Sequence, residues 1–195
     1  MMFCNTPVMR RRGTQSLWAD EHVVLPDPQV APSPLAPLSS ILGPTAALSF
    51  VAAHTKTIKL DTGVIILSQR NPLVMSKELA SVDVLSKGRL IFGVSVGYLR
   101  PEFDALGIPF EHKGARAIDY LRAMQAIWSH AAPSYTGRLV SYAGIQVQPQ
   151  PVQLPIPIVI GCYARSRTAC SFGCARTQYH TSSNTRSCTR ATIQA

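Results

Sequence analysis

A histidine beside carboxylates is the part of this sequence best suited to proton transfer. Asp20, Glu21 and His22 lie where a short apolar stretch, SLWAD at residues 16–20, comes to its end. Histidine changes its charge near neutral pH, and a neighbouring carboxylate adjusts its proton affinity, so this grouping is typical of a general acid or base. The alternative interpretation, which spacing alone slightly favours, is that His22 only caps a loop.

Polar residues or glycines end three further apolar stretches, at residues 67–71, 97–100 and 161. Barrel enzymes build their active sites at the carboxyl ends of parallel strands, so these residues are candidates to share a site with His22. Gly63 and Gly97 lie within or just after such stretches. A glycine there indicates either a bulge, which lets a flat ligand approach the backbone, or a close packing contact.

A zinc site would have to use four residues near the end of the chain: Cys170, Cys174, His180 and Cys188. Their C-x3-C…H…C spacing is loose compared with the paired ligands of zinc motifs. The chain has five cysteines, an odd count for a disulfide framework. We therefore predict no metal site.

The net charge of +9 is located at the two ends of the chain. Residues 1–12 contain three arginines and residues 162–195 five, with no acidic residue in either, whereas residues 13–161 contain 11 basic and 10 acidic residues. Nucleic-acid binding needs Lys and Arg clustered on a folded face, with aromatic residues where single strands are bound. We therefore predict no nucleic-acid partner.

Apolar runs alternate with helical patterns along the middle of the chain. Continuous apolar runs are typical of parallel strands covered on both faces, and they predict strands at residues 16–20, 58–67, 89–96 and 156–161. Helices are predicted at residues 44–54, at 71–86 between an Asn71 cap and Lys87-Gly88, just after Pro101, and at 114–129. Residues 26–44 form a proline-rich loop and residues 138–148 a small hairpin.

This alternation predicts an α/β fold with a parallel sheet. Two architectures compete, an open doubly wound sheet and a (β/α)8 barrel. A nucleotide-binding doubly wound sheet usually shows a G-x-G-x-x-G loop after its first strand, and the nearest pattern, Gly93-x3-Gly97, does not fit. Neither a G-x4-G-K-S/T loop nor a G-x-S-x-G elbow occurs, so phosphoryl transfer and serine hydrolysis have no motif support.

Composition divides the chain into three parts. Residues 1–15 are an irregular lead-in, residues 16–161 form the domain, and residues 162–195, which contain no Leu, Val, Met, Lys, Asp or Glu, are predicted to be disordered. Such an abrupt change of composition is what an out-of-frame C-terminus would produce. No apolar run reaches 18 residues, and the first arginines follow an apolar stretch instead of preceding it. We therefore expect no membrane partner, no signal peptide and a cytoplasmic location.

Three segments resemble the bacterial-luciferase-like superfamily of flavin and deazaflavin enzymes: residues 17–26 (LWADEHVVLP), 58–128 (which begins IKLDTGVIILSQRNP and includes GRLIFGVSVGYLRPEF) and 151–161 (PVQLPIPIVIG). The likeness is greatest to the class that depends on coenzyme F-420, a deazaflavin. It implies a (β/α)8 TIM barrel. The sequence has counterparts only for about strands two to five, so we expect a partial barrel, since a whole one takes about 250 residues.

The resemblance also implies roles for single residues. His22 would be the catalytic residue near the reactive ring, beside Glu21. Gly63 and Val64 occupy the position where relatives carry a bulge with a non-prolyl cis peptide behind the ring. The other cofactor contacts that it implies are Val96, Gly97 and Tyr98, at the ring and its side chain, and Gly161, at the phosphate, where Cys162 replaces a second glycine.

The implied function is hydride transfer from reduced coenzyme F-420 to a small organic substrate, with His22 handling a proton. The alternatives are an FMN-dependent luciferase-like monooxygenase and a non-catalytic barrel fragment. We expect weak phosphate contacts because of Cys162. We also expect replacement of His22 to leave stability almost unchanged, because a loop-facing histidine has little core to lose. The helices at 44–55 and 71–86 are expected to form a homodimer surface.

Overall fold

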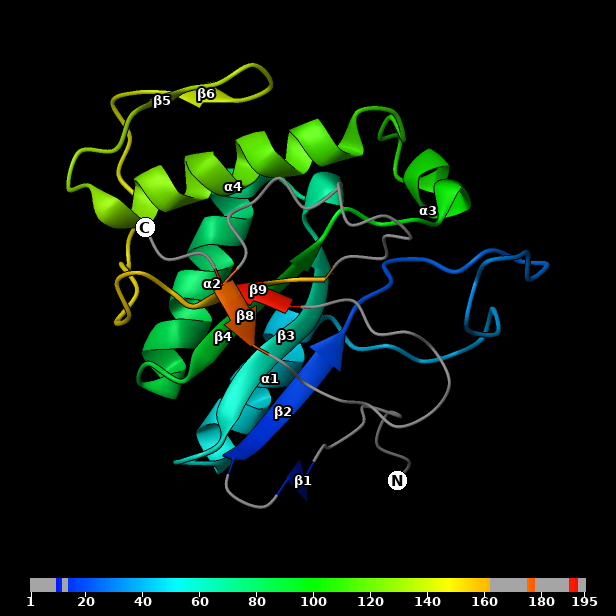
Figure 1. Cartoon of the computed structure of the whole chain (residues 1–195), viewed down its shortest axis with the longest axis horizontal. Helices are drawn as coiled ribbons and strands as arrows, with labels where there is room; N and C mark the ends of the chain where they lie inside the picture. Colours follow the sequence, from blue (N-terminus) through cyan, green and yellow to red (C-terminus); the bar gives the residue numbers. More distant parts are fainter. Residues whose placement is uncertain (1–9, 12–13, 162–174, 178–189, 193–195) are drawn as a thin grey trace.

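The parallel strands of the molecule follow one another across the sheet in chain order. The computed structural model describes residues 10–11, 14–161, 175–177 and 190–192. Four neighbouring strands run parallel: β2 (Thr14–Asp20), β3 (Lys59–Ile66), β4 (Leu90–Ser95) and β7 (Ile158–Ile160) (Figure 1). A doubly wound sheet reverses its strand order at a switch point, whereas a barrel adds each strand beside the last. The order therefore has the form of a barrel.

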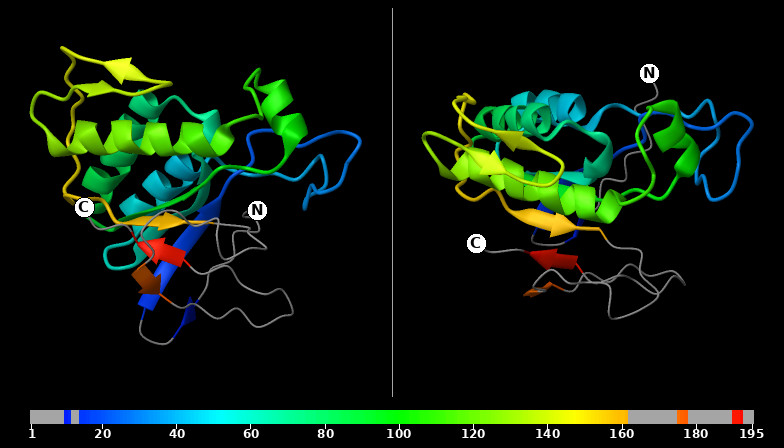
Figure 2. Two further views of the ribbon diagram at one scale, coloured as in Figure 1. Left: turned by 45° about the horizontal axis from the view of Figure 1, so that its top comes forward. Right: turned by 90° about the horizontal axis from the view of Figure 1, so that it is seen from above.

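Each crossover between parallel strands contains a helix. The helices are α1 (Pro44–His54) between β2 and β3, α2 (Pro72–Ser86) between β3 and β4, and α3 (Arg100–Ala105) and α4 (Lys113–Ser129) between β4 and β7. A short 3-10 helix, η1 (Leu67–Gln69), directly follows β3. Figure 2 shows α1, α2 and α4 on one face of the sheet. In a barrel this helix-covered face is the outer one.

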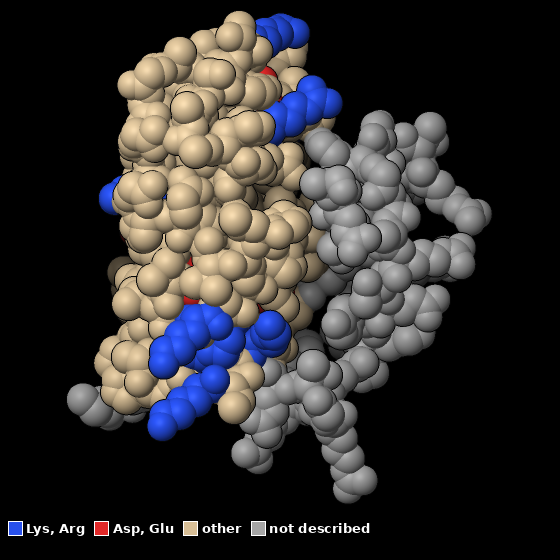
Figure 3. All heavy atoms as spheres, turned by 90° about the vertical axis from the view of Figure 1, so that its left-hand side faces the viewer, with Lys and Arg blue, Asp and Glu red and all other residues tan. Residues whose placement is uncertain are grey.

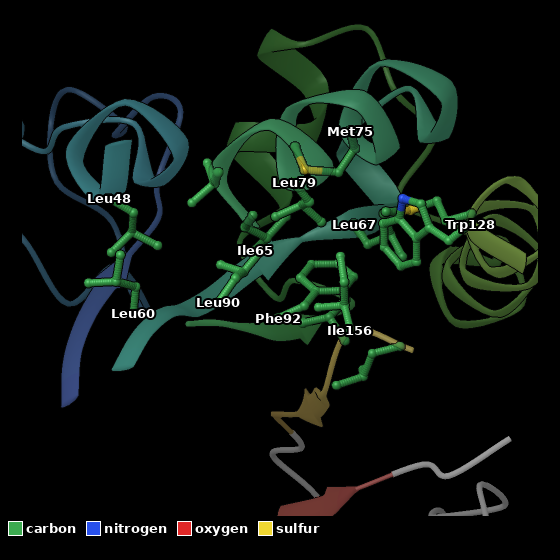
Figure 4. Packing of buried hydrophobic residues seen from close by; sticks show 14 of the residues in the cluster. Leu48, Leu60, Ile65, Leu67, Met75, Leu79, Leu90, Phe92, Trp128 and Ile156 are labelled. Atoms are coloured by element: carbon green, nitrogen blue, oxygen red, sulfur yellow. The ribbon is translucent and has the colours of Figure 1, made fainter. Parts of the chain in front are cut away.

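The hydrophobic core fills the space between the strands and these helices (Figure 4). Its members come from the strands (Leu60, Ile65, Leu90, Phe92) and from the helices (Leu48, Met75, Leu79, Trp128), and none is more than 4% exposed. The Trp128 indole donates a hydrogen bond to the Ser76 carbonyl at 3.1 Å, so α4 is tied to α2 by a polar contact as well as by packing.

The predicted ends of α2 are confirmed. The Asn71 side chain accepts hydrogen bonds from the N–H groups of Leu73 and Val74, and Lys87 ends the helix in a left-handed conformation before Gly88. The predicted hairpin lies earlier than expected, with β5 (Tyr135–Thr136) paired to β6 (Ser141–Tyr142). Its place is set by Asp119 of α4, which accepts hydrogen bonds from the Tyr135 hydroxyl at 2.7 Å and the Leu139 N–H at 2.6 Å.

The ends of the chain contain short strands that the sequence does not predict. β1 (Arg10–Arg11) pairs antiparallel with β2, which begins at Thr14, two residues earlier than expected. β8 (Ala175–Thr177) and β9 (Arg190–Thr192) pair with each other, and β9 pairs antiparallel with β7. The rest of residues 162–195, with Cys162 and the residues considered as zinc ligands, lies outside the described residues, so the predicted disorder and the three-part division remain predictions.

On the side of the molecule shown in Figure 3, several lysine and arginine side chains form a group near the bottom, and others stand apart at the top and at the left edge. Among the helices that the structure describes, none is long and apolar enough to cross a membrane.

Candidate active site

His22 is held by a buried glutamate from α3. The imidazole follows β2 directly, its side chain is 10% exposed, and its Nδ1 lies 3.2 Å from Oε2 of Glu102, whose side chain is fully buried. The other carboxylate oxygen of Glu102 accepts a hydrogen bond from the Val23 N–H at 2.7 Å. The expectation of a loop-facing His22 with little to lose is therefore wrong, because the ring is the partner of a buried acid.

The contacts of Glu102 favour its charged form. Burial raises its pKa, but hydrogen bonds from His22 and Val23, the charge of His22 and the nearby Gln69 amide outweigh burial and lower the pKa below 4.5. An ionised carboxylate only accepts hydrogen bonds, so Nδ1 of His22 carries a proton and donates a hydrogen bond to Glu102. In the neutral ring, Nε2 is then the nitrogen with a lone pair.

Tyr98 stands beside His22 at the end of β4. The two rings are edge to face, with centroids 6.1 Å apart and planes at 89°. Tyr98 is 45% exposed. Partial burial and, second, the negative charge of Glu102 raise the pKa of the phenol above 10, so it keeps its proton at neutral pH. The structure thus brings an imidazole and a phenol together at one edge of the sheet.

The bulge expected in β3 is present at Gly63. The register of β3 shifts against both β2 and β4 at this point, and Gly63 has a φ of +59°. A Cβ there would displace the Asp20 carboxylate and lie 3.0 Å from the Ala19 carbonyl oxygen, so the backbone conformation and the lack of space both favour glycine. The expected non-prolyl cis peptide is not found: among the described residues every cis bond precedes a proline. The positive φ of glycine bends the strand instead.

Val64 of β3 and Gly161, which follows β7, come together across the intervening strand β4. The Gly161 N–H donates to the Val94 carbonyl at 2.8 Å, and a Cβ on Gly161 would lie 3.3 Å from Val64 Cγ2, so the glycine leaves space beside the valine. Val96, which follows β4, is 38% exposed. Gly97 has a φ of +74°, and a Cβ there would lie 2.6 Å from Ile66 Cγ2, so this turn also requires glycine.

Glu21, expected at the cofactor, has both carboxylate oxygens engaged within the protein. It is 5% exposed, Oε2 accepts a hydrogen bond from the Ile66 N–H at 2.9 Å, and Oε1 is paired with Arg70. These contacts join the loop after β2 to the end of β3 and to the residue after η1. Glu21 therefore braces the strand ends on which the other predicted site residues lie.

Glu102 is missed by sequence reasoning, whereas Gln69 belongs to the stretch 67–71 that the sequence places near the site. Glu102 is hidden because it lies 80 positions from His22, and the only signal is an acid in the first turn of a short helix after a strand end. Gln69 is recognisable only as part of the polar stretch after β3. The residue is 7% exposed, and its amide lies buried near Glu102, yet neither amide atom has a hydrogen bond of good geometry.

A cleft of about 390 Å³ lies on the other side of η1 and is not lined by the residues predicted to bind a cofactor. We call it the η1–α4 cleft. Its lining includes residues of η1 and its end, of α4 and of the β5–β6 turn: Ser68, Gln69, Arg70, Arg116, Tyr120 and Leu139.

Comparison of the sequence with known proteins gives a family and partial relatives. The profile of the luciferase-like monooxygenase family matches residues 10–171. An uncharacterised protein of Mycobacterium tuberculosis is 29% identical over 157 residues, which are 76% of this chain and 56% of that protein. An FMNH2-dependent dimethylsulfone monooxygenase of Pseudomonas putida is 31% identical over 90 residues, 45% of this chain and 25% of the enzyme. The chain thus spans about half the length of the first of these relatives and a quarter of the second.

Solved structures have the same fold. The monooxygenase RslO1 from Streptomyces bottropensis matches with a TM-score of 0.63 and 25% identity, over 74% of this chain and 41% of the other. The coenzyme F-420-dependent tetrahydromethanopterin reductase from Methanopyrus kandleri matches with a TM-score of 0.57 and 22% identity, over the same shares. The strand order, the helix-covered face and a family profile that matches most of the sequence agree, and the chain belongs to the luciferase-like monooxygenase family.

Proposed function

We propose that this chain is a flavin- or deazaflavin-dependent oxidoreductase that acts on a small organic molecule. The observation that carries the proposal is the His22–Glu102 pair, which lies beside Tyr98 at the carboxyl ends of the parallel strands. This is the edge at which barrel enzymes place their chemistry. A buried carboxylate that holds an imidazole is also an arrangement suited to proton transfer.

The residues at this edge fit a flat ring with one polar side. Val64 and Val96 offer apolar surface, and Gly161 leaves beside Val64 the space that a side chain would fill. His22 and Tyr98 offer polar atoms at the strand ends next to them. A bound flavin or deazaflavin supplies the redox chemistry, and the protein supplies binding, orientation and proton handling.

Each polar residue then has a distinct task. Glu102 holds the Nδ1 proton of His22, so that Nε2 exchanges a proton with the substrate or the ring. The Tyr98 phenol, which stays protonated at neutral pH, donates a hydrogen bond. Glu21 and Arg70 act as positioning residues, because they fix the strand ends on which the ring would rest.

Two cofactors have support. The sequence resemblance is greatest to the F-420 class, and a reductase that depends on this coenzyme has the same fold. FMN is supported equally, because a curated relative is an FMNH2-dependent monooxygenase. Hydride transfer from reduced F-420 and FMN-dependent monooxygenation therefore stand as two forms of the proposal.

The test is a fluorescence titration of the full chain with FMN and with coenzyme F-420. We expect at least one to bind, and Gly161→Leu to weaken that binding by at least about tenfold, since it fills the space beside Val64 and forfeits apolar contact. Gly43→Leu is the matched control, because a Cβ on Gly43 would have no neighbouring atom within 4 Å. A folded chain that binds neither compound would favour the non-catalytic alternative.

A further inference from the structure

The lining of the η1–α4 cleft contains basic residues but no acidic ones. The basic residues are two arginines, Arg70 and Arg116. Arg70 is neutralised by its ion pair with Glu21. None of the ion pairs in the described part of the chain involves Arg116. This residue is 8% exposed, and its guanidinium donates to the carbonyls of Pro109 at 2.8 Å and Glu111 at 3.0 Å.

Carbonyl groups orient a guanidinium but do not cancel its charge. The nearest acid on the same helix, Asp119, is not part of the lining, and its oxygens accept hydrogen bonds from Tyr135 and Leu139. A positive charge that is mostly removed from water and lacks an acidic partner favours an anion beside it. Arg116 therefore gives the cleft a site for one negative group.

The remaining walls combine a polar stretch, residues 68–71, with apolar side chains. Ile108 and Pro109 come from the loop between α3 and α4, Tyr120 from α4, and Leu139, which is 46% exposed, from the β5–β6 turn. A volume of about 390 Å³ admits a small organic molecule and falls within the range of ligand pockets. An ion without an apolar part would leave these walls unused.

We propose that the η1–α4 cleft binds a small organic carboxylate, with the carboxylate on Arg116 and the apolar body against Tyr120 and Leu139. The cleft shares η1 with the His22 site, because Ser68 bonds to the Val96 carbonyl at 2.9 Å and the Gln69 amide lies near Glu102. A ligand there would contact the segment that supports the strand ends. The inference does not depend on a bound cofactor.

Benzoate, benzamide and inorganic phosphate are the probes, titrated calorimetrically into the full chain without cofactor. Benzoate should bind at least about tenfold more tightly than its neutral isostere benzamide, the size expected of one charge-assisted hydrogen bond. It should also bind more tightly than phosphate, which cannot use the apolar walls. Equal affinity for benzoate and benzamide would overturn the carboxylate assignment, and equal affinity for phosphate would overturn the role of the walls.

Variants of residues that line the cleft test whether benzoate binds there. Arg116→Met should reduce benzoate binding to the level of benzamide, with a thermal melt to confirm folding. Both Leu139→Lys and Leu139→Glu remove an apolar contact, so each should weaken benzamide binding to the same extent. Benzoate should bind about two- to fivefold more tightly to Leu139→Lys than to Leu139→Glu, with a smaller difference in high salt. Leu154→Glu, at a position 63% exposed and outside the cleft, is the control. If Leu139→Glu and Leu154→Glu act alike, benzoate does not bind in the cleft.

Discussion

The most consequential contact at the scale of single residues joins His22 to Glu102. The acid is buried completely, and its two oxygens are used by an imidazole and by the backbone N–H of the next residue, Val23. One carboxylate therefore fixes the position of the imidazole ring and of the loop in which His22 lies. This arrangement makes the histidine a structural element as well as the candidate proton-transfer group.

His22→Ala should reduce turnover in any assay that the wild-type chain supports by about 10²–10⁴-fold, the usual contribution of a general acid or base. It should also lower stability by about 1–3 kcal/mol, because Glu102 loses a buried partner. Thermal melts and rates measured on the same preparations check both effects. Adding Glu102→Gln to His22→Ala should restore part of the stability and none of the activity. Full activity in the His22→Ala variant would show that His22 has no role in the mechanism.

Glu102 also predicts how stability depends on pH. Its pKa in the folded protein lies below the unfolded value of 4.5. A group of this kind stabilises the fold above the unfolded pKa, and its contribution is lost as pH falls through the folded pKa. Melting temperatures measured from pH 7 to pH 3 should therefore fall less steeply for Glu102→Gln than for wild type. Glu111→Gln is the comparison, because the hydrogen bond with Arg100 also lowers the pKa of Glu111 but at an exposed site, where the effect on stability is smaller. Parallel curves for Glu102→Gln and wild type would contradict the prediction.

At the scale of the elements, the β3 bulge depends on one glycine. Gly63→Ala should destabilise the fold by more than the roughly 1–2 kcal/mol of a left-handed conformation, because its Cβ would also crowd the Ala19 carbonyl oxygen, 3.0 Å away, and displace the Asp20 carboxylate. Gly107→Ala separates the two costs, since Gly107 has a φ of +67° and open space around it. Chemical denaturation gives both values. Equal losses for the two variants would mean that the close approach of β2 and β3 does not require glycine.

The strands and helices could be predicted from the sequence more fully than the site. Buried parallel strands appear in the sequence as continuous apolar runs, and Asn71 and Lys87-Gly88 mark the two ends of α2. These local signals therefore predict the bounds of the elements to within a few residues. Contacts between distant segments leave no such pattern. Glu102 could not be paired with His22, and the bend at Gly63 could not be distinguished from a cis peptide, because both depend on how β2, β3 and α3 meet in space.

At the scale of the whole molecule, the four parallel strands and the helices on one face form part of a barrel wall. Family membership and the barrel form agree with the sequence resemblance, and the match covers 41% of the Streptomyces structure. Every residue predicted to meet the ring lies in a described strand or just after one, and Gly161, the predicted phosphate contact, directly follows β7. The described part of the chain thus contains the residues that the proposal assigns to the flavin or deazaflavin ring.

Self-association through α1 and α2 remains a prediction, and exposed apolar side chains support it. Phe50 of α1 and Leu85 of α2 are each 59% exposed, and Val74 of α2 is 56% exposed. Phe50→Glu combined with Leu85→Glu should convert a dimer to a monomer in light scattering. Leu38→Glu, at a loop position that is 93% exposed, should not. A wild-type chain that is monomeric at high concentration would end the idea.

The central claim is that Glu102 holds His22 with its Nε2 toward the cofactor ring. Nuclear magnetic resonance of the full chain labelled with ¹⁵N at histidine tests it most directly, with His22 assigned by its loss in His22→Gln. We predict a protonated Nδ1 in the free protein at neutral pH, and a shift of the Nε2 resonance when FMN or coenzyme F-420 binds. An unprotonated Nδ1, or an unchanged Nε2 resonance in a chain that has bound either cofactor, would contradict the claim.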